Sequence, residues 1–243
     1  MSHRFHIPTL PESGHVTLPA GVARHLDVLG LGVGSEVVLF DGTGREAVAR
    51  IVQTGKGAAE AEIVQSRDAR GESSVAVTLA TAVPKGRRMD TLVRMCAELG
   101  VARIVPLVTR RSVVKLPEGD DRAGKLARWR KICVAAGEQS GRNVLAEIAP
   151  AATLRTLFAG TGDYDLAVLL TPDDSAATLP ALLASRADAK SILLILGPEG
   201  GFTDDEVALA ASSGALPARL TRSVLRIETA CVAAVATTVM TLG

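Results

Sequence analysis

The chain has 243 residues, of which 47% are hydrophobic; this is ample for one large domain or two smaller ones and excludes a disordered protein. The formal net charge of +1 conceals a segregation, because residues 84–142 hold 14 basic and 6 acidic groups while both flanking segments are acidic. The middle segment favours a surface that faces a polyanion; a solvated helix face is the alternative.

Residues 1–72 predict a small β-rich domain. Short apolar runs alternate with turns, at 37–40, 46–52 and 61–64. The Asp-Gly pair at 41–42 lies between two of these runs and is typical of a hairpin. We expect a small barrel with one helix at 20–29 packed across it, followed by a polar linker at 67–74.

From residue 75 onward, buried strands alternate with helices. Strands are predicted at 75–83, 103–108, 166–170, 192–196 and 218–220, and helices at 90–99, 122–140, 175–186, 204–213 and 226–241. This alternation predicts an α/β domain with a mostly parallel sheet covered by helices on both faces. Ligands of such open sheets bind beyond the carboxyl ends of the strands.

A glycine-rich string, Leu196-Gly197-Pro198-Glu199-Gly200-Gly201-Phe202, follows the predicted strand at 192–196. Thr203 and Glu206 then have the spacing of a capping box, so the strand should end in a glycine turn that opens a helix. Proline fixes one φ angle there, and the glycines permit positive φ or the close approach of a ligand. The string therefore predicts a rigid loop that presents bare backbone to a ligand; an ordinary tight turn is the alternative.

A second string, Leu225-Arg226-Ile227-Glu228-Thr229-Ala230, opens a stretch to residue 242 that is otherwise nearly all apolar or small. Charged groups at the entrance of a buried helix need partners or a ligand, because an unpaired buried charge is costly. The string is therefore the second candidate for the functional site.

Several common chemistries lack their residues. There is no G-x-G-x-x-G after the first strand of the predicted sheet and no G-x-x-x-x-G-K-[ST]. All histidines fall in the N-terminal segment, at 3, 6, 15 and 25, so neither a His-based triad nor a metal centre is expected in the α/β part. The cysteines are three in number and widely spaced, at Cys96, Cys133 and Cys231. We therefore expect buried core thiols rather than disulfide or zinc partners. These residues fit a reaction in which a non-metal cofactor supplies the reactive group and the protein binds and orients it.

The start of the chain has no apolar core of signal-peptide length. The apolar stretch at the other end contains Glu228 and several threonines and is too short to span a bilayer comfortably. We therefore expect a soluble, cytoplasmic protein.

Together the two strings resemble the signature pair of the ribosomal RNA small subunit methyltransferase E family, a SPOUT family that methylates N3 of a uridine in 16S rRNA. The resemblance covers nearly the whole chain. Further motifs match in order, at His25-Leu26, Lys85-Gly86-x-x-Met89-Asp90, Glu98-Leu99-Gly100-Val101, Arg111-Ser112-Val113-Val114 and Glu138-Gln139-Ser140-Gly141-Arg142. The chain departs from the family pattern in positions that concern RNA docking, at Leu29-Gly30-Leu31, Met95 and Thr221-Arg222-Ser223, and leaves the cofactor loops intact.

The resemblance implies a PUA-like RNA-binding barrel over 1–72 and a SPOUT methyltransferase domain with a deep trefoil knot over 73–243. It implies a homodimer that acts on 16S rRNA or the 30S subunit, with S-adenosyl-L-methionine (AdoMet) bound bent in the knot. The implied cofactor-binding residues are Thr171, Leu196, Gly197, Pro198, Glu199, Gly200, Gly201, Leu220, Val224, Leu225, Thr229 and Ala230.

Methylation at uridine N3 requires loss of the N3 proton, so the enzyme must stabilise a developing uridine anion. We expect Arg226 in this role, because a guanidinium stays charged and can fork onto a carbonyl oxygen; a structural salt bridge to Glu228 or Glu199 is the alternative. Glu199 is either a base or, as we favour, a residue that orders the loop. The expected RNA-binding residues are Arg24, His25, Arg87, Arg88, Arg110, Arg111, Lys115 and Arg142.

Two other functions stay open. One is a SPOUT enzyme that modifies another rRNA or tRNA position, such as a tRNA ribose; the PUA-like N-terminal part and the Arg226-x-Glu228-Thr229 string count against it. The other is a non-catalytic RNA-binding or ribosome-assembly protein, which should not bind AdoMet in a calorimeter.

Overall fold

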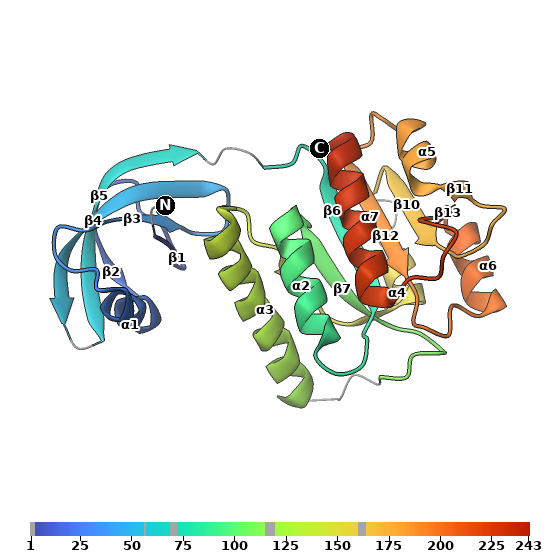
Figure 1. The fold of residues 1–243 in the computed structure, drawn as a ribbon, viewed down its shortest axis with the longest axis horizontal. Coiled ribbons are helices and arrows are strands. Elements are labelled where there is room, and N and C mark those ends of the chain that lie inside the picture. Colours follow the sequence, from blue (N-terminus) through green and yellow to red (C-terminus); the bar gives the residue numbers. More distant parts are fainter. Residues whose placement is uncertain (1–2, 56, 69–71, 115–119, 160–163) are drawn as a thin grey trace. The chain divides into compact units, whose positions relative to one another are not determined.

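The structure is a computed structural model that describes residues 3–55, 57–68, 72–114, 120–159 and 164–243. The chain divides into two compact units (Figure 1). Unit 1 comprises Met1–Glu72 and Val134–Leu145, and unit 2 comprises Ser73–Cys133 and Ala146–Gly243. The stretch Val134–Leu145, which the sequence pattern leaves inside the α/β domain, therefore belongs by its contacts to unit 1.

Unit 1 is built on a mixed five-stranded sheet. Its elements are β1 (Arg4–His6), β2 (Gly14–Leu18), α1 (Ala20–Leu29), β3 (Glu36–Phe40), β4 (Arg45–Gly55) and β5 (Ala58–Asp68). The strand order is β1-β3-β4-β5-β2, with β1 parallel to β3 and the other pairs antiparallel. The hairpin predicted around Asp41-Gly42 joins β3 and β4. Because β1 and β2 lie at opposite edges of the sheet, the closed barrel stays a prediction.

The helix α1 covers the core of unit 1 as expected. Leu26 of α1 is fully buried and shares one apolar cluster with Phe5 of β1 and Ile51 of β4. Gly30 ends the helix in the left-handed region, at φ +68°, and its N–H group donates to Asp27 O. This glycine is one of the departures from the family pattern, and the structure gives it a helix-ending role.

Unit 2 is built on an eight-stranded sheet. Its elements are β6 (Ala76–Ala82), α2 (Arg88–Leu99), β7 (Arg103–Val108), α3 (Asp120–Ser140), β8 (Glu147–Ile148), β9 (Ala152–Thr153), α4 (Leu154–Phe158), β10 (Leu166–Leu170), β11 (Ala177–Thr178), α5 (Leu179–Ala184), β12 (Ser191–Leu196), α6 (Asp204–Ser212), β13 (Leu216–Arg219) and α7 (Ile227–Leu242). The order is β11-β13-β10-β12-β6-β7-β8, with β9 also paired to β7, and every recorded pair is parallel. The predicted α/β class with a mostly parallel sheet is confirmed. The helix α3 begins in unit 2, and its last residues belong to unit 1.

Helices cover both faces of this sheet. Ala80 of β6 shares a buried cluster with Leu154 of α4 and Ala210 of α6. The next residue, Thr81, points to the other face, where its Oγ1 lies 3.3 Å from Cys231 Sγ of α7. On that face α7 packs against α2 and α5, and Figure 1 shows α2 and α7 side by side.

The cysteines are core residues, as predicted. Cys96, Cys133 and Cys231 are all buried and free. Burial raises the pKa of Cys133 and of Cys231 to about 12, so both thiols stay protonated and unreactive. In the described part of the chain, no group of His, Cys, Asp and Glu side chains could hold a metal ion.

The helix predicted at 175–186 is shorter than expected. Asp173 Oδ1 accepts hydrogen bonds from the backbone N–H and the hydroxyl of Ser175, which holds this segment in a turn. The short strand β11 follows, and Thr178 then caps α5. The side-chain turn at Asp173 therefore delays the helix.

The sheet places the candidate site at the carboxyl ends of its strands, which we call the carboxyl edge. β13, β10 and β12 are neighbours, so the segments that follow them, at 220–226, 171–176 and 197–203, start from adjacent carboxyl ends. The segments after β6 and β7 start from the same edge.

None of the described helices is long and apolar enough to cross a membrane.

Candidate active site

The glycine loop, residues 197–202, is a tight turn between β12 and α6. Gly201 N donates to Pro198 O at 2.8 Å, and Gly201 has a φ of +70°, which favours glycine. At Gly197 the constraint is space, because an added Cβ would lie 3.0 Å from Cε2 of Phe202. The ring of Phe202 packs toward the apolar core under α6. Glu199 and Gly200 are exposed at the tip of the loop.

The capping box predicted from Thr203 and Glu206 is present. Glu206 N donates to Thr203 Oγ1 at 3.3 Å, and Thr203 N donates back to Glu206 Oε2 at 2.8 Å. Glu206 is buried, and its Oε1 also accepts from Arg110 N at 2.9 Å. One carboxylate thus fixes the start of α6 and ties it to the segment that follows β7.

The guanidinium of Arg111 lies against the glycine loop. Its Nη1 donates to Gly200 O at 3.0 Å and to Phe202 O at 3.1 Å. The stem of Arg111 packs beside Gly200, where an added Cβ would lie 3.4 Å from Arg111 Cβ. The sequence predicted Arg111 as an RNA contact, and its hydrogen bonds to the loop were not foreseen.

The second string forms the entrance of α7. Arg226 is the N-cap residue, and its carbonyl accepts from Ala230 N at 2.8 Å. Its side chain is exposed, and no hydrogen bond or ion pair of its guanidinium is recorded among the described residues. A cation at the N-terminus of a helix is electrostatically unfavourable, because the helix dipole places partial positive charge there. The guanidinium of Arg226 and the helix dipole together concentrate positive potential at this end of α7.

Glu199 and Glu228, the alternative partners of Arg226, are instead paired with Arg88. Arg88 Nη1 lies 3.8 Å from Glu199 Oε1, and Arg88 Nε lies 3.8 Å from Glu228 Oε1. Arg88, at the start of α2, thereby links the glycine loop with the entrance of α7. The other carboxylate oxygen, Glu228 Oε2, is buried without a hydrogen-bond partner among the described residues. Such an oxygen suits a cationic or hydroxyl-bearing ligand.

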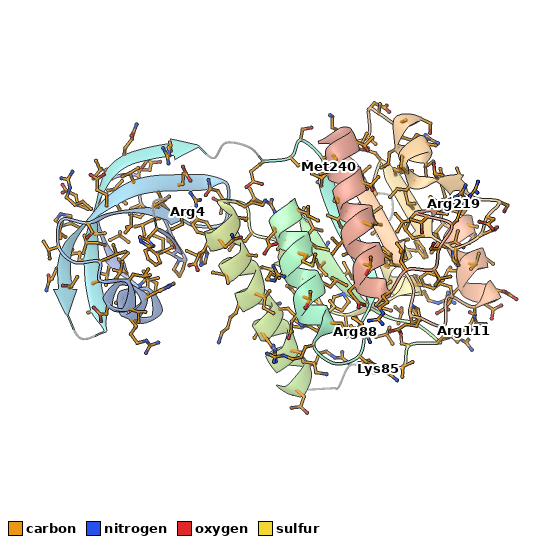
Figure 2. The ribbon with its side chains drawn as sticks, in the orientation of Figure 1. Arg4, Lys85, Arg88, Arg111, Arg219 and Met240 are labelled. Atoms are coloured by element: carbon orange, nitrogen blue, oxygen red, sulfur yellow. The ribbon has the colours of Figure 1, made fainter. Side chains whose placement is uncertain are left out.

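Several basic residues of unit 2 lie near this edge. Lys85, Arg88 and Arg111 gather toward the lower end of the unit in Figure 2, where α7 begins. Arg87 and Arg110 are exposed beside them in sequence. Arg128 is paired with Asp90. Lys115, another expected RNA contact, lies outside the described residues.

In unit 1 the expected RNA contacts differ from one another in exposure. Arg24 and His25 are exposed on α1, and the ring of His25 meets Phe5 edge to face at 5.4 Å. Arg142 is mostly buried: its side chain is 15% exposed, and its Nη2 lies 2.6 Å from Glu72 Oε2. Arg142 therefore takes part in an ion pair inside unit 1.

A buried polar network in unit 1 was not predicted. Glu46 accepts from Arg4 Nη1 at 2.9 Å, from Asn143 Nδ2 at 2.8 Å and from Arg67. Burial raises the pKa of Glu46, but these three hydrogen bonds together hold it below its ordinary value. The network binds the segment after α3 to the sheet of unit 1.

A second carboxylate in unit 1, Glu72, follows the same pattern. Its Oε1 accepts from the backbone N–H groups of Asn143 and Val144 at 2.9 and 3.0 Å. Burial raises the pKa of Glu72, and the hydrogen bonds from Arg142 and from these two N–H groups lower it below its ordinary value. No sequence motif marks this cluster, because its members are far apart in the chain.

The expected cofactor-binding residues fall on the three neighbouring segments. Leu196 and Pro198 are buried, whereas Val224 and Thr229 are exposed. Thr171 N donates to Ala218 O at 2.9 Å, which joins the ends of β10 and β13. The remaining residues of the set, Leu220, Leu225 and Ala230, are partly buried. A ligand at this edge would meet backbone groups and small side chains.

Comparisons with known proteins agree with this geometry. Residues 71–239 match the RNA methyltransferase domain family, and residues 18–64 match the RNA methyltransferase PUA domain family. Ribosomal RNA small subunit methyltransferase E of Synechocystis sp. is 33% identical over 223 residues, which cover 91% of this chain and 71% of that protein. The protein of the same name from Bacillus subtilis is 28% identical over 84% of this chain and 81% of its own.

Two solved structures are similar over almost their whole length. One is ribosomal RNA small subunit methyltransferase E from Neisseria gonorrhoeae bound to S-adenosyl methionine, with a TM-score of 0.88, 33% identity, and coverage of 97% of this chain and 96% of that chain. The other is a methyltransferase of Legionella pneumophila in complex with SAM, with a TM-score of 0.88, 32% identity and the same coverage. The chain belongs to the ribosomal RNA small subunit methyltransferase E family.

Proposed function

We propose that this protein transfers a methyl group from AdoMet to N3 of a uridine in the 16S rRNA of the small ribosomal subunit. The observation that carries the proposal is the meeting of the glycine loop and the entrance of α7 at the carboxyl edge of a parallel sheet, joined by Arg88. In open sheets of this kind ligands bind at that edge. Family membership adds the reaction class.

AdoMet fits the residues at this edge. The backbone of 196–201 and the segments around Thr171, Leu220 and Val224–Ala230 would hold it, since they offer peptide groups and small side chains at adjacent strand ends. The buried, unpartnered Oε2 of Glu228 suits the hydroxyl and cationic groups that AdoMet carries. When bound, AdoMet supplies an electrophilic methyl group on a sulfonium.

The path of the chain near this edge supports the proposed knot. β13 lies beside β10 and β11, yet α7, which follows it, packs against α2, β6 and β12. The segment between Arg219 and Ile227 must therefore cross the ends of β10 and β12. We attribute this crossing to threading through the preceding loops, as in the deep trefoil knot of the SPOUT superfamily.

Arg226 is the residue that we assign to the chemistry. Loss of the N3 proton leaves negative charge on the uridine ring, and a guanidinium at the positive end of α7 would stabilise it. The side chain is exposed and pairs with neither Glu199 nor Glu228. It is therefore available to a substrate, whereas the two carboxylates are oriented by Arg88.

The RNA would contact the basic residues of unit 2, Arg87, Arg88 and Arg110, with unit 1 as a PUA-like barrel that adds contacts through Arg24 and His25. The positive excess of residues 84–142 supports this placement. With six aromatic residues in the chain, phosphate and shape contacts should outweigh base stacking. A cytoplasmic location follows from a ribosomal substrate.

We also propose that the protein acts as a homodimer through α7. The inner face of this helix is buried within unit 2, yet Met240 is 83% exposed, and Val224 just before the helix is 86% exposed. A second copy would cover these side chains and bring its own residues close to the entrance of α7.

The test is to incubate the protein and labelled AdoMet with 30S subunits from a strain that lacks the enzyme, and to locate the label. Label at a single uridine of 16S rRNA is expected. Label on a ribose, or no label in the 16S rRNA, would overturn the proposal. Absence of AdoMet binding by calorimetry would instead favour a non-catalytic RNA-binding protein.

A further inference from the structure

The segment after β7 forms a compact turn that touches the glycine loop. In this turn, residues 109–112, Thr109 N and Thr109 Oγ1 both lie within hydrogen-bond distance of Ser112 Oγ, at 3.1 and 2.9 Å. Ser112 N in turn donates to Thr109 O at 3.2 Å. These bonds close the turn on itself and fix the direction in which Arg111 leaves it.

The contact between the turn and the loop bridges two strand positions. The sheet order is β12-β6-β7, so the 109–112 turn and the glycine loop follow strands that are separated by β6. Three hydrogen bonds span this distance: two from Arg111 Nη1 to the carbonyls of Gly200 and Phe202, and one from Arg110 N to Glu206. The turn therefore holds the second half of the loop, at Gly200 and Phe202, and the first turn of α6, at Glu206.

The bonds of Arg111 are directed at the part of the loop that turns. Gly200 and Phe202 flank Gly201, the residue with φ +70°, and a single guanidinium nitrogen donates to both of their carbonyls. A donor in this place fixes the orientation of the peptide planes on either side of Gly201. Hydrogen bonds from a charged group are stronger than neutral ones, so the restraint is considerable.

We infer that Arg111 is a positioning residue for the cofactor loop, and that it serves AdoMet binding through this loop rather than RNA binding through phosphate contact. The inference rests on the proposed function, in which 196–201 holds AdoMet. Without Arg111, the loop would have to be ordered when the cofactor binds, which weakens affinity. The apparent affinity falls in proportion to the fraction of molecules that hold the competent loop conformation.

The neighbouring residue provides a matched control. Arg110 carries the same charge in the same turn, and its contact with Glu206 is made by the backbone, so Arg110→Ala keeps that bond. Arg111→Ala removes both bonds to the loop. Arg111→Lys keeps the charge, but its ammonium ends one bond short of the position of Nη1 and cannot bond both carbonyls in the same geometry.

The experiment measures AdoMet affinity by calorimetry without RNA, and steady-state KM and kcat with 30S subunits. We expect Arg111→Ala and Arg111→Lys each to weaken AdoMet binding about tenfold, since loss of hydrogen bonds from a charged donor has an effect of this order. KM for AdoMet should rise likewise, while kcat at saturating AdoMet and KM for the 30S subunit stay near wild type. Arg110→Ala should leave AdoMet affinity unchanged.

Each other outcome has a definite meaning. If Arg111→Lys binds AdoMet as the wild type does and Arg111→Ala weakens only 30S binding, Arg111 is a phosphate contact and the inference is overturned. If Arg111→Ala does not fold, Arg111→Lys alone decides. If the wild type binds no AdoMet at all, the proposed function fails, which is a different result from equal binding by wild type and variants.

Discussion

Arg88 Nε lies 3.8 Å from Glu228 Oε1, across the space between the start of α2 and the entrance of α7. The same guanidinium reaches Glu199 in the glycine loop through Nη1, also at 3.8 Å. One arginine thus links the glycine loop with the entrance of α7, the two segments whose sequences mark the candidate site. The contacts are longer than hydrogen bonds and partly exposed, so they orient side chains more than they stabilise the fold.

Replacement of Arg88 by alanine should affect the site and spare the fold. Both pairs are partly exposed and longer than hydrogen bonds, so we expect the free energy of unfolding to change by less than about 1 kcal/mol. Glu199 and Glu228 would lose their common partner, and AdoMet affinity should fall several-fold. Arg87→Ala, in the adjacent exposed position, is the control. Equal AdoMet affinity of the two variants in a calorimeter would contradict the role given to Arg88.

Gly197→Ala should disturb the loop through the ring of Phe202. The added Cβ would lie 3.0 Å from Cε2 of the ring, so the ring or the loop must shift. We expect a loss of about 1–3 kcal/mol in unfolding free energy, typical of overpacking, together with weaker AdoMet binding. Adding Phe202→Leu should recover part of the melting temperature in the double variant. If the second change brought no recovery, the clash would lie elsewhere.

Acid should weaken unit 1 through Glu46. Its pKa is lowered in the folded state, so the ionised form adds stability that is fully present above the unfolded-state pKa of about 4.3. This contribution disappears as the pH falls through the lower folded-state pKa. Glu46→Gln should therefore lose less unfolding free energy than the wild type between pH 6 and pH 3.

At neutral pH, Glu46→Gln should be less stable by about 3 kcal/mol, since it removes one partner of a buried charge network. Glu36→Gln, which breaks the exposed pair with Arg50, is the control, and its effect should stay below about 1 kcal/mol. Urea unfolding should be followed by circular dichroism. Tryptophan fluorescence would report on unit 2, because Trp129, the single tryptophan, lies there and Glu46 lies in unit 1. Parallel pH curves for wild type and Glu46→Gln would refute the network.

Arg142 and Arg87 should separate stability from RNA binding. Arg142 is ion-paired with Glu72 in unit 1, so Arg142→Ala should lower the melting temperature and leave the salt dependence of 16S rRNA binding unchanged. Arg87 is exposed in unit 2, and its replacement should reduce the slope of log affinity against log salt by about 0.7. A reduced slope for Arg142→Ala would restore its assignment as an RNA contact.

Arg226→Ala should separate cofactor binding from methyl transfer. Because the exposed guanidinium is assigned to the uridine anion, methylation of 30S subunits should be abolished while calorimetric AdoMet binding largely survives. Removal of one such stabilising group reduces kcat by about 100-fold or more in other enzymes. Near-normal turnover by this variant would remove Arg226 from the mechanism.

Sequence patterns predicted the elements that carry local signals. β12, Ser191–Leu196, was predicted at 192–196 because those five residues are all apolar, and the start of α6 because Thr203 and Glu206 form a capping box. The strands β8, β9 and β11 have two residues each, and no periodicity can reveal them. The boundary of unit 1 was also hidden, since only contacts in space assign Val134–Leu145 to it.

The site was predictable in part for the same reason. The glycine loop and the entrance of α7 are marked by their own residues, and family resemblance connected them. The links made by Arg88 and Arg111 join residues that are far apart in sequence, and an arginine near the start of a helix or in a turn looks like any other basic side chain. Both were predicted as RNA contacts because charge was the only visible property.

The identity of the methylated nucleoside tests the proposed reaction most directly. Subunits from a strain that lacks the enzyme are treated with the protein and AdoMet, the 16S rRNA is digested, and its nucleosides are resolved by mass spectrometry against standards. We expect one 3-methyluridine per subunit in the presence of the wild type and none with Arg226→Ala. A 2′-O-methylated nucleoside, or no new methylated nucleoside at all, would contradict the proposed reaction.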